Sequence, residues 1–125
     1  MHIGILQFEM HIDDAMSLKD KRRVVKSIKD RLHHEHMVSV AEIGALDVWN
    51  LAVLAVVAVN RDGGYLRTML EGVLGKLAAW PAARLGEHSL EVVPDSAILA
   101  DSVADDGTPL WTPDERREQP PENPS

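Results

Sequence analysis

The sequence predicts an α+β protein in which a four-stranded antiparallel sheet carries two helices on one of its faces. Two observations point to this class. Four segments have the residue pattern of β-strands, and two longer segments between them repeat their apolar residues at the spacing of amphipathic helices. The segments follow one another in the order β-α-β-β-α-β, and right-handed crossovers turn that order into one sheet with both helices on the same side.

The first strand is expected over residues 2–12, where the side chains alternate between two faces. One face would carry Leu6, Phe8, Met10 and Ile12, and the opposite face Ile3, Ile5, Gln7, Glu9 and His11. Asp13 and Asp14 then lead to Ser17, which is predicted to cap the first helix. Ser17 followed three residues later by Asp20 is a close relative of the capping box.

The first helix, predicted over residues 17–32, is both amphipathic and basic. It contains seven of the 13 Lys and Arg residues of the chain. Its apolar residues fall within about a third of the helical circumference, and they are Leu18, Val24, Val25, Ile28 and Leu32. The adjoining third carries Lys19, Arg22, Arg23, Lys26 and Lys29, with Asp30 as the only acidic residue among them. Lys21 projects near the middle of the apolar arc, and because it lies in the first turn we expect its side chain to snorkel past the end of the core.

Two further strands are expected in the middle of the chain. The first is a short strand over residues 37–43, followed by a loop over 44–47. Trp49 and Asn50 open the next strand, whose residues 51–59 are apolar on both faces. This continuous apolar pattern is typical of a strand at the centre of a sheet.

The second helix and the last strand complete the fold. The apolar residues from Leu66 to Leu77 recur at helical spacing, and the helix is predicted to end near Trp80. Gly72 and Gly75 each disfavour a helix by about 1 kcal/mol relative to Ala, so we expect them to allow close packing on a neighbouring element. The last strand is expected over residues 84–93.

These elements together predict a ferredoxin-like sandwich over residues 1–93 and a disordered tail over residues 94–125. The tail has eight acidic residues against Arg116 and Arg117, and it contains six of the seven prolines. The preceding domain is nearly neutral, so most of the formal net charge of −7 belongs to the tail.

The composition excludes several classes of protein. The chain has no cysteine, which excludes disulfides, thiol catalysis and thiolate metal sites. No apolar run reaches the length of about 18 residues that a membrane-spanning helix needs. The N-terminus lacks the charged and apolar regions of a signal peptide. We therefore expect a cytoplasmic protein without a membrane segment.

Three stretches resemble a known family. They are residues 17–27 (Ser-Leu-Lys-Asp-Lys-Arg-Arg-Val-Val-Lys-Ser), residues 38–42 (Val-Ser-Val-Ala-Glu), and the pair Asp47 and Trp49. Through them residues 1–93 are similar to the bacterial YlxP-like family, small proteins of unknown function. The resemblance implies the ferredoxin-like fold. By the association of that family with translation and ribosome-maturation proteins, it also implies a ribosomal or RNA partner. It implies no catalytic residues.

The basic helix is the predicted RNA-binding site. Cations in the first two turns of a helix are disfavoured by the helix dipole, by roughly a few tenths of a kcal/mol each, so stability alone would not gather them there. A capped helix N-terminus with clustered cations suits the phosphates of a nucleic-acid backbone. We predict a non-enzymatic protein that associates with RNA or the ribosome and uses no cofactor or metal. The predicted contacts are Lys19, Lys21, Arg22, Arg23, Lys26 and Lys29.

A protein-interaction or dimerisation module without a nucleic-acid role is the alternative hypothesis. The uncovered sheet face would carry Ile3, Ile5 and one side of strand 51–59, an apolar surface suited to a second copy or a docked protein. Asp47 and Trp49 fit a turn and a packing role, and they fit a partner contact as well.

Two polar clusters are weaker candidates. His33, His34 and His36 gather at the end of the first helix, but neighbouring residues of a helix point apart, which argues against a metal site. Asp13 and Asp14 have the composition of a carboxylate pair for acid–base chemistry, yet adjacent acids before a helix cap are ordinary loop residues.

Overall fold

A computed structural model describes residues 1–99 of the chain, which divides into two units, Met1–Pro94 and Asp95–Ser125. The first unit contains six helices and strands in the predicted order. They are β1 His2–His11, α1 Leu18–Glu35, β2 Ser39–Gly44, β3 Leu51–Asn60, α2 Gly63–Ala78 and β4 Arg84–Pro94. The described part of the second unit is a short helix, α3, over Asp95–Leu99.

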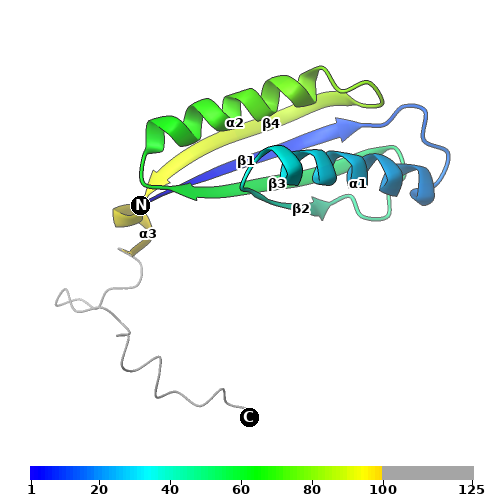
Figure 1. Cartoon of the computed structure of the whole chain (residues 1–125). Helices are drawn as coiled ribbons and strands as arrows, with labels where there is room; N and C mark the ends of the chain where they lie inside the picture. Colours follow the sequence, from blue (N-terminus) through cyan, green and yellow to red (C-terminus); the bar gives the residue numbers. More distant parts are fainter. Residues whose placement is uncertain (100–125) are drawn as a thin grey trace, which may run out of the picture. The chain divides into compact units, whose positions relative to one another are not determined.

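The strands of the first unit form one four-stranded antiparallel sheet in the order β2-β3-β1-β4. The two central strands pair along their whole length, from His2 opposite Asn60 to His11 opposite Leu51. Both long helices lie on the same face of the sheet, α1 over β2 and β3 and α2 mainly over β4 and β1, and the other face is open (Figure 1). This arrangement confirms the predicted ferredoxin-like sandwich.

The hydrophobic core lies between the helices and the covered face of the sheet. The predicted inner face of β1 is buried as expected, and its large side chains are Leu6, Phe8, Met10 and Ile12. Ala52, Leu54 and Val56 of β3 continue this buried layer beside it. The helices complete the core on the side opposite the sheet. Their buried residues are Val25, Ile28, Leu32, Leu70, Val73 and Leu77.

The N-terminus of α1 has the predicted cap. The Ser17 side chain accepts a hydrogen bond from the backbone N–H of Asp20 at 3.2 Å. The Asp20 carboxylate in turn accepts from the backbone N–H of Met16, the residue before the cap, at 2.9 Å. The two hydrogen bonds satisfy one free donor of the first helical turn and one donor of the chain that enters it, in the manner of a capping box. The helix continues beyond the predicted end at Leu32 and stops at Glu35.

The second helix follows its apolar pattern, but its glycines do not act as predicted. Asp62 caps α2 by accepting from the backbone N–H of Tyr65 at 3.1 Å. A Cβ added at Gly72 or Gly75 would meet nothing within 4 Å, so these residues face open space and the predicted close packing is wrong. The close approach occurs instead at Gly4 of β1, where a Cβ would lie 2.6 Å from Leu70 Cδ1.

Other boundaries also differ from the prediction. Trp49 and Asn50 lie in the turn before β3 rather than inside the strand. Pro94 is still part of β4, and residues 95–99 form α3, so the segment after the sheet begins with a helical turn instead of irregular chain. The rest of the predicted disordered tail, residues 100–125, lies outside the described residues. Across the described chain no helix has the length and apolar character needed to cross a membrane.

Candidate nucleic-acid interface

Five of the six predicted RNA contacts lie along the outer side of α1. The side of the helix turned toward the sheet is occupied by Val25, Ile28 and Leu32, which are buried. The cations of the outer side are Lys19, Arg22, Arg23, Lys26 and Lys29; the first four are exposed and Lys29 is half-buried. Since a helix rises 1.5 Å per residue, they form a stripe about 15 Å long.

Little negative charge opposes this stripe. Lys26 Nζ lies 2.7 Å from Asp30 Oδ2. Both side chains are exposed, and the two residues are about one helical turn apart. Within residues 1–99 the other four cations have no carboxylate partner. The carboxylate of Asp20 already accepts the backbone N–H of Met16. The stripe therefore keeps most of its positive charge available to an anion.

Lys21 is not part of this surface, and its prediction as a phosphate contact is wrong. Its side chain is 1% exposed, and Nζ lies 2.8 Å from Oε2 of Glu42, which is itself largely buried. The same ammonium donates hydrogen bonds to three backbone carbonyl oxygens, at 2.9 Å to Ala45, 3.2 Å to Leu46 and 3.3 Å to Leu51. A buried charge is tolerated only with such partners. The position of Lys21 in the apolar arc of the helix was the sequence feature that could have indicated its burial.

The contacts of Lys21 shape the loop between β2 and β3. They hold the carbonyls at the start of the loop and at the first residue of β3 around one buried ammonium. Ala45 adopts a positive φ of 55°, and its carbonyl oxygen also accepts the N–H of Val48 at 3.0 Å, which closes a turn. The N–H of Ile12 donates to the Asn50 carbonyl at 2.9 Å and ties the loop to β1.

The side chains of this loop point outward. Leu46, Asp47, Val48 and Trp49 are all exposed, with Trp49 at 52%. In Figure 1 the loop and the beginning of α1 lie at the same end of the sheet. Sequence reasoning left the role of Asp47 and Trp49 open, because nothing local distinguishes a packed Trp from an exposed one.

The other end of α1 is fastened to α2. Lys76 Nζ lies 2.6 Å from Glu35 Oε1 and 2.8 Å from His36 Nε2. The hydrogen bond from Lys76 holds the pKa of the Glu35 carboxyl below its ordinary value. Burial, together with the Lys76 charge, lowers the pKa of the His36 imidazole. The Arg31 guanidinium stacks over the Trp80 ring, 5.2 Å from its centroid.

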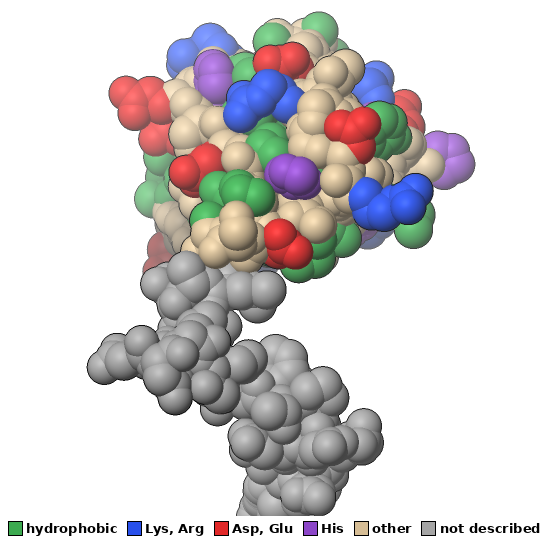
Figure 2. Space-filling view, turned by 90° about the vertical axis from the view of Figure 1, so that its left-hand side faces the viewer, with side chains coloured by type: hydrophobic (Ala, Val, Ile, Leu, Met, Phe, Trp, Pro, Cys, Tyr) green, Lys and Arg blue, Asp and Glu red, His purple; other side chains and the backbone are tan. Residues whose placement is uncertain are grey.

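The histidine cluster at this end does not converge on one point. His33 and His34 are exposed on α1, whereas His36 faces Lys76. Across the described residues no group of three or more His, Asp or Glu side chains is placed to hold a metal ion. The surface at this end, seen in Figure 2, mixes Lys and Arg with Asp, Glu and His without a large area of one charge.

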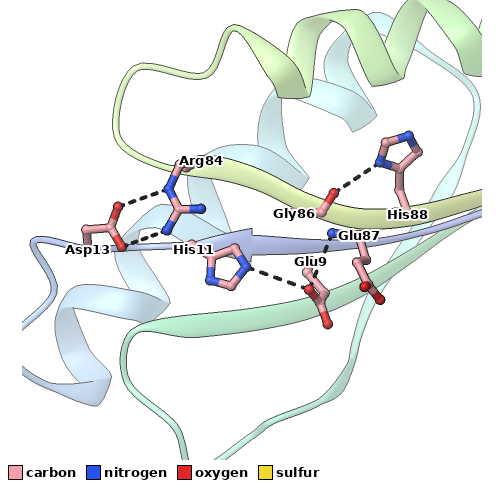
Figure 3. A network of polar contacts seen from close by, with 7 residues as sticks. All are labelled: Glu9, His11, Asp13, Arg84, Gly86, Glu87 and His88. Carbon is pink, nitrogen blue, oxygen red and sulfur yellow. Dashed lines mark hydrogen bonds and ion pairs between the residues drawn. The ribbon is translucent and has the colours of Figure 1, made fainter.

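The open face of the sheet has a polar half, drawn in Figure 3. Figure 3 labels Glu9, His11, Asp13, Arg84, Gly86, Glu87 and His88. The side chains of Glu9, His11 and Glu87 point away from the helices, whereas His88, which pairs with the inward-facing Phe8, points toward the side of the helices. Glu9 accepts the backbone N–H of Glu87 at 3.3 Å and lies 3.6 Å from His11 Nε2. Arg84 pairs with Asp13 at 3.3 Å, so one of the two loop aspartates takes part in an ion pair with the start of β4. Glu9 and Glu87 lie at the strand irregularity between β1 and β4 and line a hollow of about 250 Å³.

The other half of the open face is apolar, but only in part accessible. Val59 is 61% exposed and Val57 is exposed beside it, while Ile3 and Ile5 are half-buried. Further along β1 the same face carries Gln7, Glu9 and His11, as the alternation of the strand predicts. The predicted apolar surface is therefore present along Ile3, Ile5 and the outward side of β3, and it borders these polar residues.

Comparison with known proteins identifies a family and names no activity. Over 79 residues the chain is 35% identical to "Uncharacterized protein YlxP" of Bacillus subtilis (strain 168), an alignment that covers 63% of this chain and 86% of that protein. The predicted resemblance to the YlxP-like family is thereby confirmed. A family model described as "Protein of unknown function (DUF503)" matches residues 3–89, and the chain belongs to this family.

Proposed function

We propose that this protein is a non-enzymatic, cytoplasmic RNA-binding protein, and that its target is the ribosome or another structured RNA. It binds the phosphate backbone along the outer side of α1. The observation that carries the proposal is the row of accessible cations at Lys19, Arg22, Arg23, Lys26 and Lys29, of which only Lys26 has a carboxylate partner within residues 1–99. Association of such a row with a polyanion releases condensed counterions, which drives binding.

The position of the cations supports the same conclusion. Lys19, Arg22 and Arg23 lie in the first two turns of α1, where the helix dipole opposes positive charge. Lys21 shares this position, but its ion pair with Glu42 accounts for it. No contact within the described chain accounts for the three exposed residues, which supports a partner outside the chain over an ordinary solvated helix face.

The open face of the sheet is the weaker interaction surface. A stable protein interface needs a closely packed apolar centre. Here the apolar residues beside Val57 and Val59 are half-buried, and polar groups occupy the adjoining rows. The outer side of α1 carries five cations over several turns with Asp30 as the acid paired to one of them, which favours the nucleic-acid hypothesis over a dimerisation module.

A charge-reversal experiment tests the proposal. The variant Arg22→Glu, Arg23→Glu, Lys26→Glu should lose binding to ribosomal particles and to purified ribosomal RNA in co-sedimentation and filter-binding assays. The wild-type association constant should fall with salt, by a logarithmic slope of about −0.7 to −0.9 per phosphate contacted. Circular dichroism and urea unfolding should report an intact fold, because all three side chains are exposed.

The chain offers a control with the same change of net charge. Arg61, Arg67 and Arg84 are also exposed but lie outside α1. Reversing these three residues to Glu should leave most of the affinity and its salt dependence. Equal loss of binding in both variants would show only a general effect of charge, and undiminished binding by the α1 variant would disprove the proposal.

A further inference from the structure

The loop at residues 45–50 is built as a rigid platform rather than a flexible connection. The buried ammonium of Lys21 is bound by the carbonyls of Ala45, Leu46 and Leu51, which fixes both ends of the loop to the first turn of α1. A second tie runs from the Ile12 N–H to the Asn50 carbonyl. A loop that is already ordered loses little conformational entropy when a ligand binds to it.

This loop exposes an aromatic ring to solvent. Trp49 is 52% exposed, and Leu46 and Val48 are exposed in the same loop. An exposed indole with no role in the core is an open stacking surface, since every nucleobase has a face that stacks on an aromatic ring. By contrast Trp80, the other described Trp, is buried and covered by Arg31.

The platform adjoins the cationic stripe. Lys21 reaches the loop from the first turn of α1, and its sequence neighbours Lys19, Arg22 and Arg23 occupy the outer side of the same two turns. The loop that carries Trp49 and the first turns of α1 that carry these cations therefore lie at the same end of the sheet (Figure 1). Proteins that bind single-stranded nucleic acid combine these two features, a positively charged track for the backbone and aromatic rings for the bases.

We propose that Trp49 is a base-stacking residue for unpaired RNA: a nucleotide from a loop or single strand stacks its base on the indole while the flanking phosphates contact Lys19, Arg22 and Arg23. The proposal rests on the function proposed above and narrows it, because a paired base is already stacked within its helix and cannot reach the ring. The protein thus prefers unpaired RNA over a continuous duplex.

Substitution at Trp49 separates stacking from charge. We use a short fluorescein-labelled oligouridine RNA and a fully paired RNA duplex of the same length, with fluorescence anisotropy over a series of salt concentrations. Trp49→Ala should weaken binding of the single strand by a factor of about 5 to 150, the range expected for one base stacked on an aromatic side chain. The slope of log affinity against log salt should stay at its wild-type value, because no phosphate contact is removed.

Two further variants complete the design. Trp49→Phe keeps an aromatic face and should retain most of the affinity. Tyr65→Ala is the matched control, because Tyr65 is 58% exposed but lies in the first turn of α2, at the opposite end of β3. It should leave binding unchanged, and none of these substitutions should alter duplex binding.

The outcomes distinguish the two proposals. If Trp49→Ala leaves single-strand affinity unchanged while charge reversal on α1 abolishes it, stacking is wrong and phosphate binding stands. Equal wild-type affinity for single strand and duplex also overturns the stacking proposal. If the wild-type protein binds neither short RNA, the stacking proposal fails, and the assays with ribosomal particles and ribosomal RNA then decide the phosphate-binding proposal.

Discussion

At the scale of single residues, the basic stretch that contains Lys21, Lys19 and Arg22 has two roles, one in the core and one at the surface. Lys19 and Arg22 reach solvent, whereas Lys21 is buried and bound to Glu42 and three backbone carbonyls. Burial of an ammonium costs several kcal/mol unless partners replace the lost water, and here four oxygens do so. Lys21 is thus a structural residue inside a stretch whose other cations serve the surface.

Replacing Lys21 should destabilise the domain strongly. Lys21→Met leaves the Glu42 carboxylate and the loop carbonyls without their partner, and loss of one member of a buried ion pair typically costs about 3–5 kcal/mol. The measurement is urea unfolding followed by circular dichroism. Adding Glu42→Gln should recover part of the loss, because the unpaired charge is then removed.

The matched control for Lys21 is Lys19→Met. Lys19 has the same side chain on the same helical turn but is exposed, so its replacement should change the free energy of unfolding by less than about 0.5 kcal/mol. Similar effects of the two substitutions would contradict the buried role of Lys21.

At the scale of elements, α2 shows that an apolar period predicts which side of a helix is buried but not what lies opposite it. Leu66, Leu70, Val73 and Leu77 are buried as the spacing indicates. The glycines of this helix face open space, although close packing on a neighbour was the expectation. In α1 the same period is interrupted by a charged residue at a buried position.

Gly72→Ala and Gly75→Ala should each stabilise the protein. Both residues are inside α2 without a neighbour that a methyl group would strike, so the substitution should add about 0.5–1 kcal/mol through helix propensity. Thermal and urea unfolding measure the gain. Gly4→Ala is the contrasting variant and should cost about 1–3 kcal/mol, because its Cβ would overlap Leu70. A loss of stability at Gly72 or Gly75 would contradict the open space around these residues, because it would show that the added methyl group strikes a neighbour.

At the scale of the whole domain, the two helices are joined above the sheet by the core and, at one end, by a polar clamp. Lys76 of α2 binds Glu35 at the end of α1 and His36 just after it. Because Lys76 donates to the imidazole, the clamp needs His36 neutral. Protonation would place two cations against each other, so the connection between the helices depends on pH.

Stability should fall as the pH drops below about 6.5, the ordinary pKa of His36. The folded state holds this pKa lower through burial and the Lys76 charge, so the unfolded chain takes up the proton first and gains free energy relative to the folded one. The contribution is present above pH 6.5 and is lost between there and the lowered pKa. Below the ordinary pKa of 4.5, protonation of Glu35 should weaken the clamp further. Urea midpoints recorded across this range measure the effect.

Two histidine variants locate the pH effect. His36→Gln should remove the stability loss that begins near pH 6.5, whereas His34→Gln, at an exposed position on α1, should retain it. If both variants keep the wild-type profile, His36 is not the titrating group.

The candidate site could be predicted in part, for a physical reason that particular residues illustrate. The exposed positions of Lys19, Arg22, Arg23 and Lys26 follow from helical period, because each lies beside an apolar arc whose burial is nearly assured. The Ser17 cap and the alternation in β1 are local in the same way and are also confirmed. The resemblance to a family added a prediction of the fold, but it predicted no catalytic activity.

The sequence by itself determined the element order, the buried side of each helix and strand, and the accumulation of positive charge on α1, since each depends on residues a few positions apart. Only the tertiary structure decided that Lys21 turns inward and that Trp49 turns outward. The partners of Lys21 lie on β2, in the following loop and on β3, more than twenty positions away in the chain, and they meet at one point only when the sheet has formed. That meeting point ties the loop, and with it the exposed Trp49, to the first turn of α1.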